Sequence, residues 1–339
     1  MYSFRFLSWR YKVRAYFSRK QALNALNKNY TDKFQQDKPQ LFRSCHLWFN
    51  GVMQSAFKSI ALIGKYTSPG IQSQILTLAK FLAERGIAIF IEEKTATELD
   101  IQGYATRAMQ AIGADAELAV VIGGDGTMLM AARALGNFDI PLVGINRGNF
   151  GFLTDISSDM MLPTMTRILA GEYTLEQRIM LCAEVERDGH VFSKGRAFND
   201  VVISKGTTAK LIELEMTVDG QAVTHQRSDG MIISTPTGTT AYALSAGGPV
   251  LHPTMDAITI VPICPHTLTS RPIIVSSASK VQIQFTRGEN ARIQVDGLPY
   301  MDIELGDKVH ITRHERTVTL LHPAGHSHYE VLRKKLYWG

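Results

Sequence analysis

LAVVIGGDGTMLMAA, residues 118–132, is the stretch that decides the fold of this chain. It begins with a short apolar run typical of a buried strand, turns through GGDGT at 123–127 and continues as a helix-forming segment. Glycines let phosphate oxygens approach backbone N–H groups without interference from a Cβ, and a helix N-terminus favours anions. A carboxylate would repel such a phosphate, so Asp125 is better explained as a group that takes a proton from a neighbouring hydroxyl. The structural alternative is a tight strand–helix turn in which Asp125 is only a cap.

Residues 59–155 alternate between continuous apolar strands and amphipathic helices. Strands are expected at 59–64, 87–92, 118–123 and 141–146, and helices at 71–86, 106–114, 127–135 and about 160–171. Such strands, joined by crossover helices, imply a Rossmann-like parallel sheet that is covered on both faces. Ligands of these sheets bind beyond the carboxyl ends of the strands, where GGDGT lies. We assign residues 53–155 to this N-terminal α/β domain.

Residues 156–330 have a different character and predict a β-rich domain. Short strand-like runs occur at 181–187, 199–204, 211–218, 230–236, 257–263, 280–286, 291–297, 308–313 and 317–322. Turn residues separate them, which is typical of a β-sandwich. The segment TPTGTTAYALSAGGP (235–249) interrupts the strands as a loop and a short helix of small residues, and it suggests a polar ligand packed against backbone. Residues 331–339 are expected to form a C-terminal tail.

The first 52 residues carry the basic charge of the chain. They hold ten of the chain's 36 basic residues and two of its 31 acidic residues. The other 287 residues therefore hold 26 basic and 29 acidic residues. The globular part is therefore mildly acidic, and the sequence pI near 9.0 does not indicate that the protein binds nucleic acid. The extension at 1–52 remains open to four interpretations: a transit peptide, a membrane-surface arm, a disordered tail, or a start codon assigned upstream of Met53.

Cysteine usage and hydropathy bear on the compartment. Cys45, Cys182 and Cys264 are odd in number and far apart, which favours free thiols in a reducing compartment. No apolar run approaches the roughly 20 residues that span a bilayer. We therefore expect a cytoplasmic protein without a membrane partner. We interpret the ten histidines as lacking an H-x-x-x-H pattern or other ligand spacing, so no built-in zinc site is expected.

Other polar motifs could contact a ligand. Asn199 and Asp200 could bind ribose hydroxyls or a base edge, or could be turn residues alone. Asp229 could accept from ligand donors and Arg227 could meet a phosphate, or the two could belong to a hairpin turn with a surface ion pair. Tyr242 could stack on an adenine or nicotinamide ring, or be a core aromatic. No G-x-G-x-x-G motif follows a strand, so the sequence does not favour hydride transfer with a Rossmann-type dinucleotide site. No G-x-x-x-x-G-K-[ST] motif occurs, so it does not favour a P-loop that binds phosphate.

Taken in order along the chain, five runs closely resemble the bacterial NAD kinase family. They are GGDGT (123–127), GINRGNFGFLTD (144–155), FNDVVISKG (198–206), RSDGMIISTPTGTTAYALSAGGP (227–249) and PHTLTSRP (265–272). The resemblance extends from residue 59 to about 330. It implies an enzyme that uses ATP and a divalent cation, Mg²⁺, to phosphorylate the 2′-hydroxyl of the adenosine ribose of NAD, giving NADP and ADP. It also implies an α/β domain followed by a β-sandwich, in a homodimer or homotetramer.

The resemblance implies roles for particular residues. Asp125 matches the general base, and Gly126 would line the same pocket. Asn199 and Asp200 match the pair that holds the dinucleotide, although many relatives have Glu where this chain has Asp200. Lys210 falls where relatives carry a basic residue or His.

The implied adenine and nicotinamide contacts lie further along the chain, and a neighbouring subunit supplies part of them. They are Asp229, Thr240, Ala241, Tyr242, Ala243, Leu244 and Ser245. Arg227 would be a fixed cation near the nicotinamide that tunes discrimination between NAD and NADH. One polar contact departs from the family pattern, because Leu298 stands where a Gln often follows the VDG motif.

Two other functions compete with this interpretation. Diacylglycerol-type lipid kinases and phosphofructokinases also resemble the chain in the GGDGT run, and each phosphorylates an alcohol. They are disfavoured because the 235–249 segment and the Asn199–Asp200 pair fit a dinucleotide acceptor. The other competitor is a catalytically inactive dinucleotide sensor, against which the intact GGDGT run argues.

Overall fold

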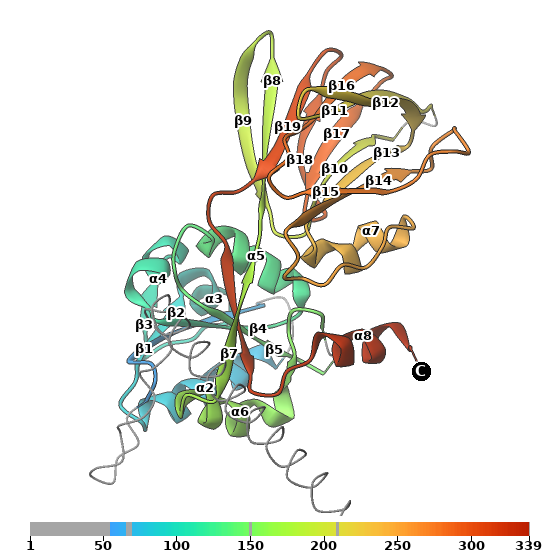
Figure 1. Cartoon of the computed structure of the whole chain (residues 1–339). Helices are drawn as coiled ribbons and strands as arrows, with labels where there is room; N and C mark the ends of the chain where they lie inside the picture. Colours follow the sequence, from blue (N-terminus) through green and yellow to red (C-terminus); the bar gives the residue numbers. More distant parts are fainter. Residues whose placement is uncertain (1–54, 66–69, 149–150, 208–209, 339) are drawn as a thin grey trace, which may run out of the picture. The chain divides into compact units, whose positions relative to one another are not determined.

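The computed structural model describes residues 55–65, 70–148, 151–207 and 210–338 (Figure 1). The expected extension at 1–52 and Cys45 lie outside these residues. Ser55–Gly339 form one unit, which contains both the α/β layers and the β-sheets described below.

The first sheet is mainly parallel and carries GGDGT at the end of a central strand. Its spatial order is β3 (Ala105–Arg107), β2 (Ala88–Glu92), β1 (Ser59–Gly64), β4 (Leu118–Ile122), β5 (Leu142–Asn146), β20 (Val318–Pro323) and β7 (Tyr173–Arg178), and β6 (Ile156–Ser157) pairs with β5. Neighbouring strands run parallel from β3 to β20, and only β7 runs antiparallel, on β20.

Helices cover both faces of this sheet. The described residues form helices α2 (Ile71–Ala83), α3 (Glu93–Glu98), α4 (Met109–Asp115), α5 (Asp125–Leu135), α6 (Met161–Leu169), α7 (Tyr242–Ser245) and α8 (His328–Leu336), with 3-10 turns η1 (Ser158–Met160) and η2 (Thr237–Thr240). Of these, α7 packs on the β-rich part described below and not on this sheet. Helices α2 and α6 lie on one face of the sheet, and α4 and α5 lie on the other (Figure 1). Ile60 and Leu62 share a buried cluster with α2 and α6, whereas Ala61 and Ile63 share one with α4 and α5. Successive strand residues point to opposite faces, so an uninterrupted apolar strand is buried on both. The expected α/β architecture is confirmed.

Two antiparallel sheets make up the β-rich part. One has the order β15 (Ile273–Ser276), β14 (Ala257–Ile263), β13 (Gly230–Ser234), β10 (Asp200–Lys205), β17 (Ala291–Val295) and β18 (Leu298–Ile303). The other has the order β12 (Gln221–Ser228), β11 (Ile212–Val218), β16 (Val281–Arg287), β19 (Lys308–Arg313), β8 (Leu181–Arg187) and β9 (His190–Ala197). Val201 and Ile233 of the first sheet share one buried core with Leu214 and Ile283 of the second. The expected β-sandwich is therefore confirmed.

Strand β20 corrects one sequence prediction. Residues 317–322 were expected among the strands of the β-rich domain, but β20 lies in the first sheet, with Leu320 beside Leu142 of β5. Leu320 and Leu321 are buried on opposite faces of that sheet. An apolar run suits a sandwich or an α/β core equally well, so local pattern does not identify its partner.

Some element boundaries also differ from expectation. The helix expected at 106–114 is replaced by the short edge strand β3 and then α4, because residues 105–107 pair with β2. Helix α5 begins at Asp125 rather than Thr127, since Gly124 accepts the first turn's N–H groups. Residues 331–336, expected within a tail, form most of α8.

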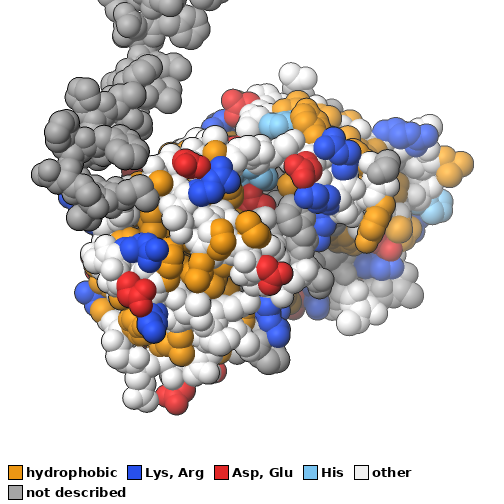
Figure 2. All heavy atoms as spheres, turned by 90° about the horizontal axis from the view of Figure 1, so that it is seen from below, with side chains coloured by type: hydrophobic (Ala, Val, Ile, Leu, Met, Phe, Trp, Pro, Cys, Tyr) orange, Lys and Arg blue, Asp and Glu red, His pale blue; other side chains and the backbone are white. Residues whose placement is uncertain are grey.

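The surface shown in Figure 2 has acidic, basic and hydrophobic side chains interspersed rather than gathered into one basic patch. This distribution agrees with the nearly balanced charge of residues 53–339. Among the described residues, no helix combines the length and the apolar character needed to cross a membrane.

Candidate active site

The GGDGT run forms the connection between β4 and α5. Gly124 is the N-cap of α5 in extended conformation, and Asp125 is the first helical residue. A Cβ added to Gly124 or Gly126 would meet no heavy atom within 4 Å, whereas one on Gly123 would collide with the Thr127 side chain. Two glycines therefore leave open space over the helix N-terminus, which suits an anion, and the third permits tight packing.

The Asp125 carboxylate is held by a second segment of the chain. Its Oδ2 accepts from Phe152 N at 2.9 Å, and its Oδ1 accepts from Leu153 N at 3.0 Å and Thr154 Oγ1 at 3.3 Å. An ionised carboxylate offers about four lone-pair sites. These contacts use three, so Oδ2 keeps one for a further donor. No side-chain bond caps α5, which contradicts the structural alternative that Asp125 is only a cap.

Gly151 leaves room for the hydrogen bonds that residues 152–154 donate to Asp125, a set of contacts called the grip on Asp125 below. A Cβ at this position would collide with Asp125 Oδ1 and with Thr154 Oγ1. Gly151 N also donates to Thr154 O at 3.1 Å, which closes the turn that presents the backbone N–H groups of residues 152 and 153. The local pattern of residues 144–155 gives no signal for this role of Gly151.

Asp296 joins the two halves of the candidate site. Its fully buried carboxylate accepts from Arg133 Nη1 of α5 at 2.7 Å, from Phe198 N at 3.0 Å, from Asn199 N at 2.7 Å and from Asp200 N at 3.2 Å. It therefore fixes the Asn199–Asp200 loop beside the helix that begins at Asp125. Asp296 was missed from the sequence, and its only local signal is the Asp-Gly turn at 296–297, where its φ is 49°.

The Asn199–Asp200 pair is buried and polar. Asp200 is only 3% exposed, and burial together with the charge of Asp296 raises the pKa of Asp200 to about 7. Asn199 Oδ1 is buried without a hydrogen-bond partner. Since buried acceptors are nearly always satisfied, this oxygen is a candidate contact for a ligand donor.

The segment after β13 lies against the same loop. Thr235 donates from its N to Asn199 O at 2.8 Å and from its hydroxyl to Phe198 O at 2.7 Å. Thr240 is half-buried, and its hydroxyl donates to Thr237 O at 3.3 Å. The expected loop and short helix are thus confirmed as η2 and α7.

The predicted residues of α7 differ in exposure. Ala243 is buried against β13 and β14, Ala241 and Leu244 are half-buried, and Ser245 is exposed. Tyr242 is 43% exposed, which excludes the core alternative. Partial burial and the charges of Cys264, Asp229 and Asp200 raise its pKa, so its hydroxyl lies within electrostatic reach of both aspartates.

A pocket of about 10 Å³ separates the segment that holds Asp125 from η2. Its lining consists of Phe152, Leu153, Arg178, Pro236, Thr237, Thr240, Pro253 and His328. Burial, followed by the positive charge of Arg178, lowers the pKa of His328 to about 4, so its imidazole is neutral at pH 7. This space is the size of about one water molecule, so a larger ligand requires the walls to separate.

Three predicted residues are not brought to Asp125 within the chain. Lys210 is exposed and forms an ion pair with Glu289 at 3.2 Å. Arg227 faces Glu213 across β11 and β12 at 3.3 Å, as the ion-pair alternative expected. Asp229 forms an ion pair with Lys205 at 2.6 Å, at the opposite end of the β10–β13 pair from Asp200.

Two histidines that the sequence interpretation did not treat as potential ligands lie together in the structure. His322 and His326 have H-x-x-x-H spacing, and both contact Asp155. Burial alone would raise the pKa of Asp155, but the hydrogen bonds and charges of these histidines lower it to about 2. The prediction that the histidines show no ligand spacing was wrong.

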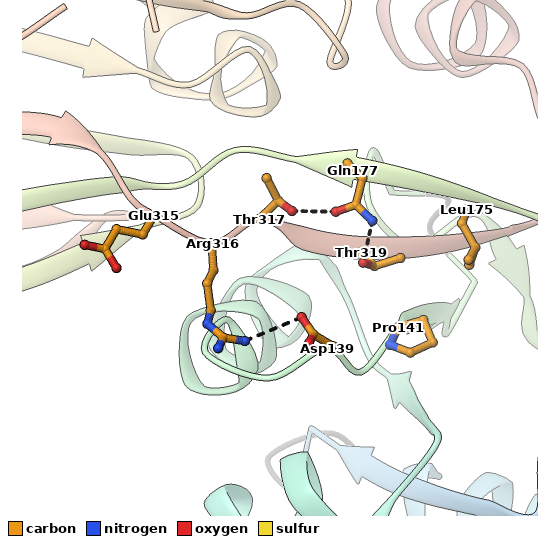
Figure 3. Close-up of a pocket in the computed structure, with 8 residues that line it drawn as sticks. All are labelled: Asp139, Pro141, Leu175, Gln177, Glu315, Arg316, Thr317 and Thr319. Carbon is orange, nitrogen blue, oxygen red and sulfur yellow. Dashed lines mark hydrogen bonds and ion pairs between the residues drawn. The ribbon is translucent and has the colours of Figure 1, made fainter. Parts of the chain in front are cut away.

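A pocket of about 400 Å³ lies away from this chemistry (Figure 3). It is lined by Asp139, Pro141, Leu175, Gln177, Glu315, Arg316, Thr317 and Thr319. Pro141 precedes β5, so this pocket is at the amino ends of the parallel strands, whereas GGDGT is at their carboxyl ends. Its polar groups also bond one another, Arg316 with Asp139 and Gln177 with both threonines. We therefore do not include it in the candidate site.

An exposed glycine loop at a helix N-terminus, a carboxylate with one lone pair left and a β-sheet loop with an unsatisfied amide oxygen define a phosphotransferase that acts on a hydroxyl group. Residues 60–173 match the ATP-NAD kinase N-terminal domain, and residues 198–322 match the ATP-NAD kinase C-terminal domain. The chain belongs to the NAD kinase family.

Individual relatives agree with this family. The chain is 50% identical over 293 residues to the NAD kinase of Aromatoleum aromaticum, which covers 86% of this chain and 98% of that protein. Two solved structures share the fold. A yeast NADH kinase complexed with NADH has a TM-score of 0.76 at 23% identity, covering 83% of this chain and 88% of that chain. An NAD kinase from Archaeoglobus fulgidus in complex with ATP has a TM-score of 0.60 at 21% identity, covering 82% of this chain and 97% of that chain.

Proposed function

We propose that this enzyme transfers the γ-phosphate of ATP to the 2′-hydroxyl of the adenosine ribose of NAD, giving NADP and ADP. The observation that carries the proposal is the Asp125 carboxylate, which is held from one side and open on Oδ2 beside an exposed glycine loop. Membership of the NAD kinase family supports NAD as the acceptor and ATP as the donor.

Asp125 acts as the general base in this proposal. The hydroxyl donates to the remaining lone pair of Oδ2. The proton moves to that oxygen as the hydroxyl oxygen attacks the γ-phosphorus of ATP, and the bond from this phosphorus to the bridging oxygen breaks, so that ADP leaves. The N–H groups at the start of α5 face the developing negative charge. Phe152, Leu153 and Thr154 keep the carboxylate in one orientation, so the base is already positioned before the substrate binds.

A divalent cation, Mg²⁺, enters this site with ATP. The residues present fit that arrangement, because Mg²⁺ usually keeps several waters and is held largely by substrate phosphates. Asp125 is the only carboxylate in the GGDGT run and its remaining lone pair is assigned to the hydroxyl, so the ATP phosphates and water would supply the ligands. The ion neutralises phosphate charge when bound.

The dinucleotide lies between the GGDGT loop and the β-sandwich in our proposal. Gly126, Asn199, Asp200, Thr240 and the residues of α7 form its contacts from one subunit. The unsatisfied Asn199 Oδ1 supports a ligand donor at this point, and the exposed ring of Tyr242 supports stacking.

Lys210, Arg227 and Asp229 act on the site of a neighbouring subunit in a homodimer or homotetramer. Their present partners are carboxylates and a lysine of the β-sandwich, and none is a residue of the GGDGT loop. We place the enzyme in the cytoplasm, which agrees with the free thiols of Cys182 and Cys264.

The test is a kinase assay with purified protein, ATP and Mg²⁺, coupled to an NADP-specific dehydrogenase. NAD should be phosphorylated, and an NAD analogue with a 2′-deoxy adenosine ribose should not. Diacylglycerol and fructose 6-phosphate serve as competing acceptors. Phosphorylation of either one in preference to NAD, or absence of NADP formation by folded protein, would contradict the proposal.

A further inference from the structure

Asp155, His322 and His326 form a compact cluster from two distant parts of the chain. Asp155 follows the residues that hold Asp125, whereas His322 belongs to β20 and His326 to the turn before α8. The Nδ1 atoms of His322 and His326 lie 2.9 and 2.8 Å from the same oxygen, Asp155 Oδ2. The two imidazole rings stack with centroids 3.9 Å apart. Three potential ligand atoms therefore already face one point.

The cluster is largely shielded from solvent. The side chains of Asp155, His322 and His326 are 7%, 4% and 12% exposed. Buried ligands of this kind need little rearrangement and lose little solvation when a cation binds. They also satisfy a metal's preference for a fixed donor set, because β20 and the following turn hold both histidines in place.

The environment of His322 Nε2 also favours metal binding through Nδ1 of the same ring. His322 Nε2 is buried without a hydrogen-bond partner and lies 3.9 Å from Glu176 Oε2. Metal-binding histidines usually direct their other N–H toward a carboxylate, which fixes the tautomer. If His322 Nδ1 offers its lone pair to a metal, its proton sits on Nε2, toward Glu176.

A pocket of about 220 Å³ adjoins the cluster. Asp155 and His326 line it together with residues 323–325, 327 and three residues of α8: Glu330, Val331 and Lys334. The pocket supplies a route from solvent and space for a water molecule as a further ligand. An entry path and an open position are expected of a site that loads from solution.

We propose that Asp155, His322 and His326 bind one transition-metal ion, Zn²⁺, at a site separate from the Mg²⁺ of the kinase reaction. Two imidazoles and one carboxylate match zinc, whereas Mg²⁺ prefers an all-oxygen set. The ion joins the β20–α8 turn to the segment at 152–155, which holds the Asp125 carboxylate. The binding site does not depend on the proposed kinase activity.

The first experiment measures binding of Zn²⁺ to the full chain after chelator treatment, by equilibrium dialysis with Mg²⁺ in excess. One equivalent of Zn²⁺ per chain is expected. Asp155→Asn and His326→Ala should weaken binding by at least about 10–100-fold. His190→Ala is the matched control, because this exposed histidine contacts only a backbone oxygen, and it should bind as the wild type does. Equal binding by all variants, or no saturable binding, would overturn the proposal and leave a hydrogen-bonded cluster.

Two measurements keep the test decisive if a variant folds poorly. Zn²⁺ should raise the Tm of the wild type and of His190→Ala, because it binds the native state. Co²⁺ bound to the wild type should show visible d–d absorption without a thiolate charge-transfer band. A thiolate band would assign the metal to a cysteine, and no Tm increase would exclude a native site; either result overturns the proposal without reference to NADP formation.

Discussion

Asp125 and Asp200 are two carboxylates of one candidate site that the fold treats in opposite ways. Asp125 is half-buried, receives two backbone N–H groups and a hydroxyl, and keeps a free lone pair. Asp200 is buried beside Asp296, and it is Asp296 that takes the backbone N–H groups and the Arg133 guanidinium. The difference teaches that the supply of hydrogen-bond donors, rather than residue type, separates the two positions: no such donor among the described residues reaches the Asp200 carboxylate, and burial beside Asp296 raises its pKa to about 7.

Asp125→Asn tests the first half of this comparison and should have the largest effect. The amide cannot take the proton, so kcat for NADP formation should fall by about 10²–10⁴-fold. The amide oxygen can accept from only one of Phe152 N and Leu153 N, and its NH2 group faces the other, so a loss of stability of about 1–3 kcal/mol should accompany the loss of activity, and kcat is measured well below the Tm. The coupled NADP assay measures kcat, and Asp139→Asn is the control because that carboxylate is exposed at the surface. Near-wild-type turnover by Asp125→Asn would refute the assignment of the base.

Asp200→Asn tests the second half through the pH dependence of stability. The folded pKa of Asp200, about 7, lies above its unfolded value, so the native state binds more protons between about pH 4 and 7. The free energy of unfolding therefore falls as pH rises through this range. Removing the carboxyl should abolish up to about 4 kcal/mol of that fall, since each pKa unit is worth about 1.4 kcal/mol.

Urea unfolding at pH 5 and pH 8 measures this difference for the wild type and Asp200→Asn. Asp302→Asn is the control, because its carboxylate is mostly exposed. The wild type and this control should lose more stability between the two pH values than Asp200→Asn. Identical losses in all three proteins would show that Asp200 is not held in its protonated form.

Gly151→Ala sharpens the comparison by disturbing the grip on Asp125 without removing the carboxylate. The added Cβ collides with Asp125 Oδ1, so the carboxylate or the turn must move. A displacement of about 1 Å can cost about 10²-fold in kcat. Thr154→Ser keeps the hydroxyl and should stay close to wild-type kcat. If Gly151→Ala retains full kcat and an unchanged Tm, the grip is unimportant for catalysis.

Arg227→Gly should give the smallest effect. The guanidinium is 59% exposed and paired with Glu213, so its influence on a bound nicotinamide is screened. Removing this cation should raise the ratio of kcat/KM for NAD to that for NADH by less than about tenfold. Arg287→Gly is the matched control, since Arg287 shares Glu213 as its partner. An unchanged ratio in Arg227→Gly would remove Arg227 from the specificity determinants.

Local pattern predicted the parts of the fold that depend on local physics. The apolar runs of β1, β4 and β5 and the helices between them follow from burial on both sheet faces. The position of Asp125 follows from the glycines around it. Strands β9 and β12 are not predicted by local pattern, because half or more of their residues are exposed and give no apolar alternation.

Long-range contacts could not be predicted in this way. Asp296 accepts hydrogen bonds from residues 198–200, nearly a hundred positions earlier, and an Asp-Gly turn is common without such a role. The grip of residues 152–154 on Asp125 likewise depends on how β5 and the following loop return to α5. His322 and His326 have a readable spacing, but their common partner Asp155 is visible only in three dimensions.

The position of β20 has a consequence for how the chain is made. β5 lies beside a strand that the ribosome synthesises only after every strand of the sandwich, as the Leu142–Leu320 pairing shows. Because β6 pairs only with Ile145 and Asn146, the part of the β5 edge at Leu142 stays unpaired throughout synthesis of the sandwich strands, and β7 has no neighbour until β20 emerges. Such long-range parallel pairing is slow, and an unpaired edge invites aggregation. The first sheet can therefore be completed only when residues 318–323 have left the exit tunnel.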